Sequence, residues 1–277
     1  MYKVLISDPI SENGIKILDN SDIEVINKPN IAKEELNKII SDIDGWIVRS
    51  GTTITADDLS KCNNLKVIGR AGVGVDNIDI AAATSQGIVV MNLPDGNTIS
   101  ASEHTMAMMS ALSRNIQLGH LGLSKGEWNR HNLVGNELKG KILGIIGLGR
   151  IGREVMKRAE SYDMEILGYD PYVNQDMFDP EKLKIVEFDE IIRDSDIITI
   201  HVPLLDSTRD LFNKDTFLKM KTSSRVVNVA RGGIINENDL ADALNNEIIA
   251  GAAIDVFKTE PLDPNSALIN SKNILLT

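Results

Sequence analysis

The chain has 277 residues, of which 42% are hydrophobic and 25% are charged, and this balance is typical of a globular protein large enough for two domains. Its formal net charge of −11 argues against nucleic acid or an anionic membrane as a partner. The single cysteine, Cys62, cannot form an intramolecular disulfide, and a small buried apolar side chain is a better interpretation of it than a nucleophile.

The sequence gives no indication of a membrane segment or a secretion signal. It has no run of roughly 18 or more apolar residues, the length that crosses a bilayer as a helix. Residues Met1–Asp8 are typical of a first strand and lack the apolar core of a signal peptide. We therefore expect a cytoplasmic protein.

Short apolar runs alternate with amphipathic segments over residues 1–94. Such alternation predicts parallel strands joined by helices that cover the sheet, and hence one α/β domain. The expected strands are Val4–Ser7, Ile23–Ile26, Gly45–Arg49, Leu65–Gly69 and Ile88–Met91, and the expected helices are Glu12–Leu18, Ala32–Ser41, a segment capped by Thr55, and Ile78–Ser85.

The pattern breaks at Asn92–Asn97, where Pro94 and Gly96 stop regular structure. Ser100–Leu118 then predicts one long helix, and Gly119–Gly140 an extended loop anchored by Trp128. The helix carries a stripe of large apolar side chains that indicates either core packing or a subunit interface. These side chains are Met106, Met108, Met109 and Leu112.

Residues 141–171 combine a strand, a glycine-rich turn, a helix and a second strand that ends in an acid. Gly147 permits the tight turn, Gly149 lets the backbone approach a pyrophosphate, and Gly152 lets the helix pack closely on the strand. The phosphates are expected at the helix N-terminus, beside Arg150 and Ile151. Asp170 suits a ribose diol and repels a 2′-phosphate, so the unit favours NAD over NADP.

The alternation continues to the last residue. The expected strands are Leu183–Val186, Ile197–His201, Arg225–Ala230, Ile249–Asp255 and Asn273–Leu276, and the expected helices are Phe188–Arg193, Thr208–Phe212, Thr216–Met220 and Glu237–Leu244. The sequence has no cysteine and histidine spacing typical of zinc, so no metal site is predicted.

Several reactive side chains follow predicted strands, where open parallel sheets bind their ligands. His201, Arg231 and Asp255 do so in the second half, and Arg49 and Arg70 in the first. If the two domains face each other, these arginines form a positive pocket for a small anionic substrate. Each arginine alone is equally compatible with a solvated strand end, and His201 with a polar strand terminus. His104, on the predicted long helix, fits a packed or interface histidine better than a base, and His120 and His131 belong to no reactive cluster.

Four motifs occur in one order that resembles the D-isomer-specific 2-hydroxyacid dehydrogenases. They are Gly69-Arg-Ala-Gly-Val-Gly-Val-Asp-Asn-Ile-Asp79, Gly147-Leu-Gly-Arg-Ile-Gly152, Asn228-Val-Ala-Arg-Gly-Gly233 and Ala253-Ile-Asp-Val-Phe-Lys-Thr-Glu-Pro261. The resemblance implies a two-domain α/β fold. A flavodoxin-like substrate domain is expected over residues 1–94, and a Rossmann-type, doubly wound NAD-binding domain over 95–277, with a dimerisation helix at 98–118.

The resemblance also implies a reaction, in which a hydride passes from C2 of a 2-hydroxy acid to NAD while a histidine takes the hydroxyl proton. Arg231 matches the arginine that binds the carboxylate, and Glu260 matches the glutamate that supports the histidine. Asp255 matches the residue that binds the nicotinamide carboxamide. His201, Pro203 and Ala230 match further cofactor contacts, and the substrate positions are Arg49, Ser50, Arg70, Gly74 and Asn97.

Val48-Arg-Ser-Gly-Thr and Gly69-Arg-Ala-Gly favour the members of the family that oxidise 3-phosphoglycerate in serine synthesis. Reduction of glyoxylate, hydroxypyruvate or another 2-keto acid stays open, as does a non-catalytic NAD-sensing role. The family's catalytic histidine lies in a Pro-His pair after the last strand, and this chain stops at Thr277. We therefore expect a fragment with weak turnover, without the helix that completes the first domain and without a regulatory domain, from a homodimer or a larger homo-oligomer.

Overall fold

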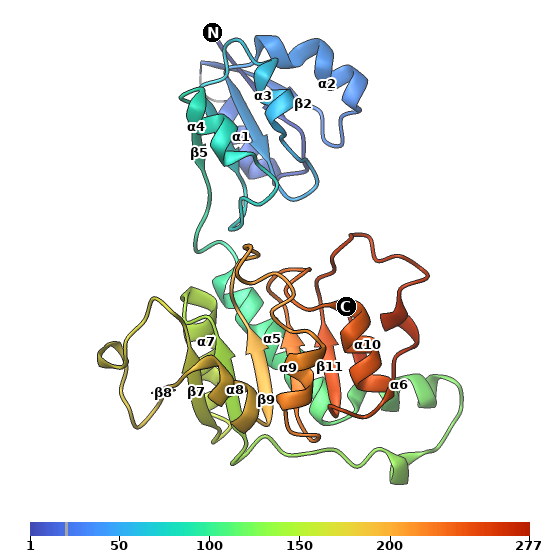
Figure 1. Cartoon of the computed structure of the whole chain (residues 1–277). Coiled ribbons are helices and arrows are strands. Elements are labelled where there is room, and N and C mark those ends of the chain that lie inside the picture. The colour runs from blue at the N-terminus through green and yellow to red at the C-terminus, as the bar shows by residue number, and fades with distance from the viewer. Residues whose placement is uncertain (20–21) are drawn as a thin grey trace. The chain divides into compact units, whose positions relative to one another are not determined.

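The computed structural model describes residues 1–19 and 22–277 (Figure 1). The chain forms two compact units, Met1–Asn97 and Thr98–Thr277. Each unit has its own parallel sheet and its own hydrophobic core, so each is described by itself. The predicted α/β class is confirmed.

The first unit is built on a five-stranded sheet in the order β2-β1-β3-β4-β5, and all its strand pairs are parallel. This is the flavodoxin-like order, with the direction of winding reversing between β1 and β3. The strands are β1 (Tyr2–Ile6), β2 (Ile23–Asn27), β3 (Gly45–Val48), β4 (Val67–Arg70) and β5 (Val89–Met91).

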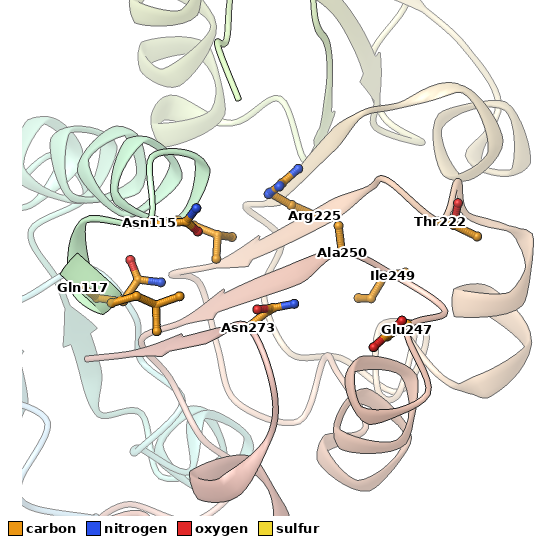
Figure 2. Close-up of a pocket in the computed structure, with 10 residues that line it drawn as sticks. Asn115, Gln117, Thr222, Arg225, Glu247, Ile249, Ala250 and Asn273 are labelled. Atoms are coloured by element: carbon orange, nitrogen blue, oxygen red, sulfur yellow. The ribbon is translucent and has the colours of Figure 1, made fainter. Parts of the chain in front are cut away.

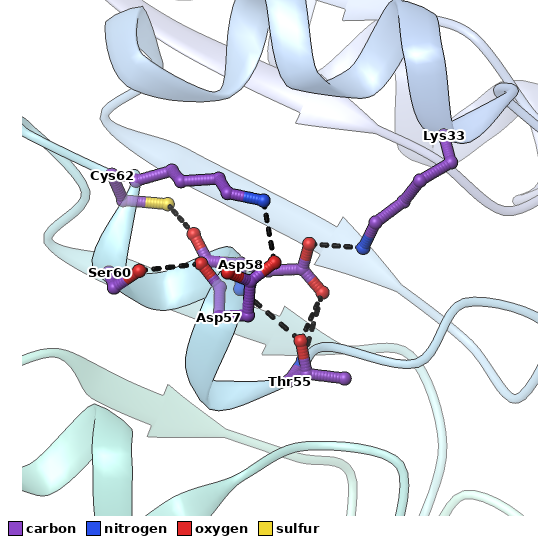
Figure 3. Close-up of polar contacts among 7 residues, drawn as sticks. Lys33, Thr55, Asp57, Asp58, Ser60 and Cys62 are labelled. Carbon is purple, nitrogen blue, oxygen red and sulfur yellow. Dashed lines mark hydrogen bonds and ion pairs between the residues drawn. The ribbon is translucent and has the colours of Figure 1, made fainter.

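Four short helices cover this sheet: α1 (Glu12–Asp19), α2 (Lys33–Ile39), α3 (Ala56–Ser60) and α4 (Ile80–Ser85). Trp46, Leu5 and Ile68 are fully buried at the centre of the core. The predicted cap is confirmed, because Thr55 and Asp58 form a reciprocal capping box at the start of α3. Lys33 forms an ion pair with the same Asp58 (Figure 3).

Cys62 lies beside this cluster and donates from its Sγ to the Asp58 carbonyl at 3.4 Å (Figure 3). Burial is the main cause that raises the pKa of the thiol to about 11, with the Asp58 charge adding to it. A thiol with so high a pKa is protonated at neutral pH and is a poor nucleophile. The packed, unreactive role predicted for Cys62 therefore agrees with its surroundings.

The second unit holds a seven-stranded sheet in the order β12-β11-β10-β9-β6-β7-β8, again wholly parallel. Counted from β6, the order is the Rossmann order with one added edge strand, so the predicted fold is confirmed. The strands are β6 (Ile142–Ile146), β7 (Glu165–Tyr169), β8 (Lys184–Ile185), β9 (Ile197–Ile200), β10 (Arg225–Asn228), β11 (Gly251–Ile254) and β12 (Ile274–Leu276).

Helices cover both faces of this sheet, because alternate strand residues point into two separate apolar clusters. Helices α5 (Thr98–Ser113) and α7 (Arg150–Glu160) pack on one face. The other face is covered by α8 (Phe188–Asp194), α9 (Lys214–Lys219) and α10 (Glu237–Asn245), which lie in front of the sheet in Figure 1.

The predicted helix Ser100–Leu118 is not continuous. It ends at Ser113, and a second helix, α6 (Ile116–Ser124), follows after Asn115, whose φ of 52° is left-handed and breaks the helical hydrogen bonding. The loop predicted over Gly119–Gly140 is therefore helical in its first part. Trp128 is 75% exposed, so it does not anchor the rest of that segment.

Two further predictions are corrected by the second unit. Met106, Met108, Met109 and Leu112 are buried in the unit's own core, so the interface interpretation of this stripe is wrong. Thr208–Phe212 is a turn rather than a helix, and Phe212 forms an isolated parallel bridge with Ile235. That bridge fixes the backbone in an extended conformation that a helix does not allow.

Candidate active site

The winding direction of the second sheet reverses between β6 and β9, and ligands of doubly wound sheets bind at such a switch point. Gly147 follows β6 with φ of 94°, and a Cβ placed there would lie 2.6 Å from the carbonyl oxygen of His201, which follows β9. A Cβ on Gly152 would lie 2.1 Å from the Gly147 carbonyl oxygen. Both glycines are therefore required by close backbone contacts inside the protein.

Gly149 is different, because a Cβ added there would meet no protein atom within 4 Å. It is the N-cap of α7, with φ of −70° and ψ of −164°, and no side chain caps the helix. Arg150 and Ile151 form the first turn of α7, and the N-terminus of a helix is suited to an anion. Open space in front of uncapped helix N–H groups fits a bound pyrophosphate.

Asp170 lies after β7, beside the glycine turn. One carboxylate oxygen accepts a hydrogen bond from the Leu148 N–H at 2.9 Å, and the other accepts one from the Tyr172 N–H at 3.0 Å. A carboxylate has about four acceptor positions, so capacity for a ribose diol remains. Asp170 thus ties the turn to the neighbouring strand and still presents acceptors to a cofactor.

His201 is held at the end of β9 by its own strand. Its Nε2 lies 2.9 Å from the Thr199 hydroxyl, and burial lowers the pKa of the imidazole to about 4. The ring is therefore neutral at physiological pH and is a weak proton acceptor. Pro203, two residues further on, accepts a hydrogen bond from the Thr208 hydroxyl at 2.7 Å.

The turn that carries Arg231 is shaped by Asn228, the last residue of β10. The Asn228 side chain accepts from the Ala230 N–H at 3.0 Å and donates to the Arg231 carbonyl at 3.0 Å. Asn228 is 1% exposed, and both hydrogen bonds are partly buried. The sequence motif contained Asn228, and an Asn directly before a turn is the local signal that could have indicated this support, because Asn side chains often bond the backbone two residues later.

Gly232 brings the turn of Arg231 against the segment that carries Glu260. A Cβ on Gly232 would lie 1.9 Å from the Phe257 carbonyl oxygen, so only glycine permits this contact. Glu260 accepts a hydrogen bond from the Phe257 N–H at 3.1 Å. The two residues predicted to be catalytic therefore belong to two loops in direct backbone contact.

Asp255 follows β11 and accepts a hydrogen bond from the Thr277 hydroxyl at 2.7 Å. His104 on α5 places its Nε2 3.2 Å from the same carboxylate. This pairing was not predicted for His104, because two residues 151 positions apart in the chain give no local signal of their contact.

In the first unit, three of the predicted substrate residues lie at the carboxyl ends of two neighbouring strands. Arg49 and Ser50 follow β3, and Arg70 is the last residue of β4. The Arg70 guanidinium lies over Gly72, where an added Cβ would be 1.4 Å from its Nη1. Gly74 lies in the turn after it, and Asn97 is the final residue of the unit.

A cavity of about 420 Å³ lies at the opposite, amino-terminal edge of the second sheet (Figure 2). Arg225, Asn115 and Asn273 line it, and no predicted site residue does. Among residues 1–19 and 22–277, no cluster of three potential ligand side chains suits a metal ion. Within the same ranges, no helix has the length and apolar character that crossing a membrane requires.

The fold and the switch-point site define a Rossmann-type dinucleotide-binding domain, and sequence comparison identifies the family. Residues 106–277 match the family described as D-isomer specific 2-hydroxyacid dehydrogenase, NAD binding domain. The chain therefore belongs to the D-isomer-specific 2-hydroxyacid dehydrogenase family, whose cofactor is NAD.

Relatives named D-3-phosphoglycerate dehydrogenase are 44% identical over 99% of this chain in Archaeoglobus fulgidus and 46% identical over 97% in Methanocaldococcus jannaschii. The chain spans about half the length of these curated relatives, 52% and 51% respectively. The crystal structure of NAD-dependent formate dehydrogenase from Staphylococcus aureus in complex with NAD superposes with a TM-score of 0.88 at 33% identity, covering 100% of this chain and 88% of that one.

Proposed function

We propose that the chain is the catalytic core of an enzyme that oxidises D-3-phosphoglycerate to 3-phosphohydroxypyruvate at the start of serine synthesis. Its similarity to relatives of that name supports the substrate. In this proposal residues 1–94 bind the acid and residues 95–277 bind NAD. Bound NAD accepts the hydride from C2, and the α7 N-terminus and Asp170 hold the cofactor.

The observation that carries the proposal is the backbone contact between Gly232 and Phe257, which joins the loops of Arg231 and Glu260. The planar guanidinium of Arg231 suits a carboxylate through two parallel hydrogen bonds, and its charge stabilises negative charge on the C2 oxygen. Glu260 supplies a carboxylate that stabilises a protonated imidazole. Within the described part of the chain, Glu260 accepts a hydrogen bond from the Phe257 N–H and none from a histidine.

Arg49 and Arg70 in the first unit are the proposed ligands of the substrate's anionic groups. The test measures binding of 3-phosphoglycerate, D-glycerate, hydroxypyruvate and glyoxylate to the NAD-loaded chain by calorimetry. We expect 3-phosphoglycerate to bind best, and Arg49→Ala or Arg70→Ala to weaken it most. Arg193→Ala is the matched control, because Arg193 is an exposed arginine paired with Asp194. Tighter binding of glyoxylate would replace this proposal with a 2-keto acid reductase.

We also propose that the enzyme is a cytoplasmic homodimer that associates through α6 and the segment after it. Within residues 116–128, four apolar side chains are at least half exposed: Ile116, Leu121, Leu123 and Trp128. A cluster of exposed apolar residues is typical of a protein interface. Leu121→Asp is expected to shift the sedimentation coefficient to that of a monomer, whereas Ile17→Asp, at an exposed position in the first unit, is not. A wild-type monomer would contradict this proposal.

A further inference from the structure

The loop Arg49–Thr52 in the first unit is held from two sides by side chains of other segments. The Asp8 carboxylate, after β1, accepts hydrogen bonds from the N–H groups of Arg49 at 2.5 Å and Thr52 at 3.0 Å. The Asn77 amide, before α4, donates to the carbonyls of the same two residues, at 2.7 Å for Arg49 and 2.6 Å for Thr52. Both backbone groups of Arg49 and of Thr52 are thus fixed.

Asp8 is itself rigidly supported. It is 2% exposed, and the Thr52 hydroxyl lies 2.9 Å from its other carboxylate oxygen. The same hydroxyl lies 2.9 Å from the Ser7 hydroxyl, which accepts from the indole N–H of the fully buried Trp46 at 2.9 Å. A buried, mutually bonded network of this kind holds its members in one geometry. The position of the loop is therefore set by the core of the unit.

The two residues between the fixed positions are Ser50 and Gly51, and both are exposed. Across residues 1–19 and 22–277, no protein group accepts a hydrogen bond from either N–H. A Cβ on Gly51 would lie 2.8 Å from the Asp8 carboxylate, so a side chain there would push the loop off its support. The Arg49 guanidinium is also exposed, and the one described acceptor in its reach is the Pro9 carbonyl at 3.4 Å.

We propose that Asp8 and Asn77 are positioning residues for an oxyanion site formed by the N–H groups of Ser50 and Gly51 and the guanidinium of Arg49. Adjacent backbone N–H groups beside a guanidinium are suited to a tetrahedral oxyanion such as a phosphate group. In the reaction proposed above, on which this assignment of the natural ligand rests, the site binds the phosphate of the substrate. Asp8 and Asn77 bind no substrate atom and act through the loop.

The test is a titration of the ¹⁵N-labelled chain with inorganic phosphate, observed by NMR. Wild-type chain is expected to show saturable shifts of the Ser50 and Gly51 amide signals. Asn77→Ala removes two hydrogen bonds to the loop and is expected to weaken phosphate binding about tenfold. Hydrogen exchange at the Arg49 and Thr52 amides reports whether the loop has loosened, and the thermal midpoint reports whether the unit is folded.

Asp79→Ala is the matched control, since Asp79 caps α4 two residues later, accepts from the Ala82 N–H at 2.9 Å and has no bond to the loop. Asp79→Ala should keep wild-type phosphate affinity even if it lowers the thermal midpoint. The inference would be overturned if phosphate shifted other amide signals but not those of Ser50 and Gly51. It would also be overturned if Asn77→Ala chain stayed folded, showed faster hydrogen exchange at Arg49 and Thr52, and still bound phosphate with wild-type affinity.

A comparison of 3-phosphoglycerate with D-glycerate separates this inference from the proposed function. If inorganic phosphate binds as expected but the two acids bind equally, the substrate assignment fails and the oxyanion site stands. If wild-type chain binds 3-phosphoglycerate more tightly than D-glycerate, and folded Asn77→Ala chain shows the same ratio of affinities, the positioning role fails and the substrate assignment stands.

Discussion

Gly149 and Gly152 lie three positions apart at the start of α7, and the structure assigns them opposite roles. We compare Gly149→Ala with Gly152→Ala, two changes that each add one methyl group. The methyl group on Gly152 would overlap the Gly147 carbonyl oxygen at 2.1 Å, whereas that on Gly149 would enter space free of protein atoms. The first substitution should therefore damage the fold and the second should damage cofactor binding.

The magnitudes follow from these two surroundings. Overpacking at Gly152 is expected to cost about 2–3 kcal/mol of unfolding free energy, which lowers the melting temperature by roughly 5–10 °C. Gly149 has a backbone conformation that alanine accepts, so Gly149→Ala should change the free energy of unfolding by less than about 1 kcal/mol. Loss of a charge-assisted hydrogen bond to phosphate costs about 2–3 kcal/mol, so Gly149→Ala should weaken NAD binding roughly 30- to 150-fold.

Calorimetry with NAD measures the affinity, and thermal unfolding without NAD measures the stability. Gly14→Ala in α1 is the control, because an alanine there makes only ordinary contacts of 3.5 and 3.6 Å. If Gly149→Ala bound NAD as tightly as wild type, the open space in front of α7 would not be the pyrophosphate site. A Gly152→Ala chain with wild-type stability would show that the close contact with Gly147 does not require glycine.

Three further predictions concern single residues of the site. The pKa of His201 is about 4 in the folded chain and about 6.5 in the unfolded chain. Between these two pH values the unfolded chain binds more protons, so the free energy of unfolding should rise with pH, by at most about 3 kcal/mol. Urea unfolding at several pH values measures this, and His201→Gln should flatten the profile. Asn228→Ala should lower the free energy of unfolding by about 2 kcal/mol and weaken binding of the 2-hydroxy acid in calorimetry, because two partly buried hydrogen bonds to the Arg231 turn are lost. Asp170→Ala should reduce the affinity for NAD about tenfold and so lower the ratio of NAD affinity to NADP affinity. An unchanged ratio would contradict the role of Asp170 at the ribose.

Local sequence signals predicted much of the fold and the cofactor site. The glycine spacing located the turn after β6, because tight turns and close backbone contacts leave little choice of residue. Thr55 indicated the start of α3 through a capping pattern that is complete within four residues. Alternating apolar runs predicted both parallel sheets, although most strands ended a residue or two earlier or later than expected.

Most features that the sequence missed depend on contacts between distant segments, and one depends on the conformation of a single residue. Asn115 interrupts a helix whose composition favours continuation, and the break is visible only in the backbone. The methionines of α5 fit a core or an interface equally well until their packing is known. The pairing of His104 with Asp255 and the support of Arg49 by Asp8 and Asn77 join separate elements, so no spacing rule contains them.

The wholly parallel pairing of both sheets has a consequence for how the chain folds. Two neighbouring parallel strands cannot be joined by a hairpin, so each pair forms only after a longer crossover segment has brought the strands together. At the amino-terminal end of β6, the Ile142 N–H donates to the Asp196 carboxylate 54 residues later, and β6 pairs with β9. Such non-local pairing slows folding because loop-closure entropy is lost before the contacts form. The glycine turn and His201 therefore come together only after the intervening elements β7, β8 and α8 have folded. We expect the chain to become able to bind NAD late in folding.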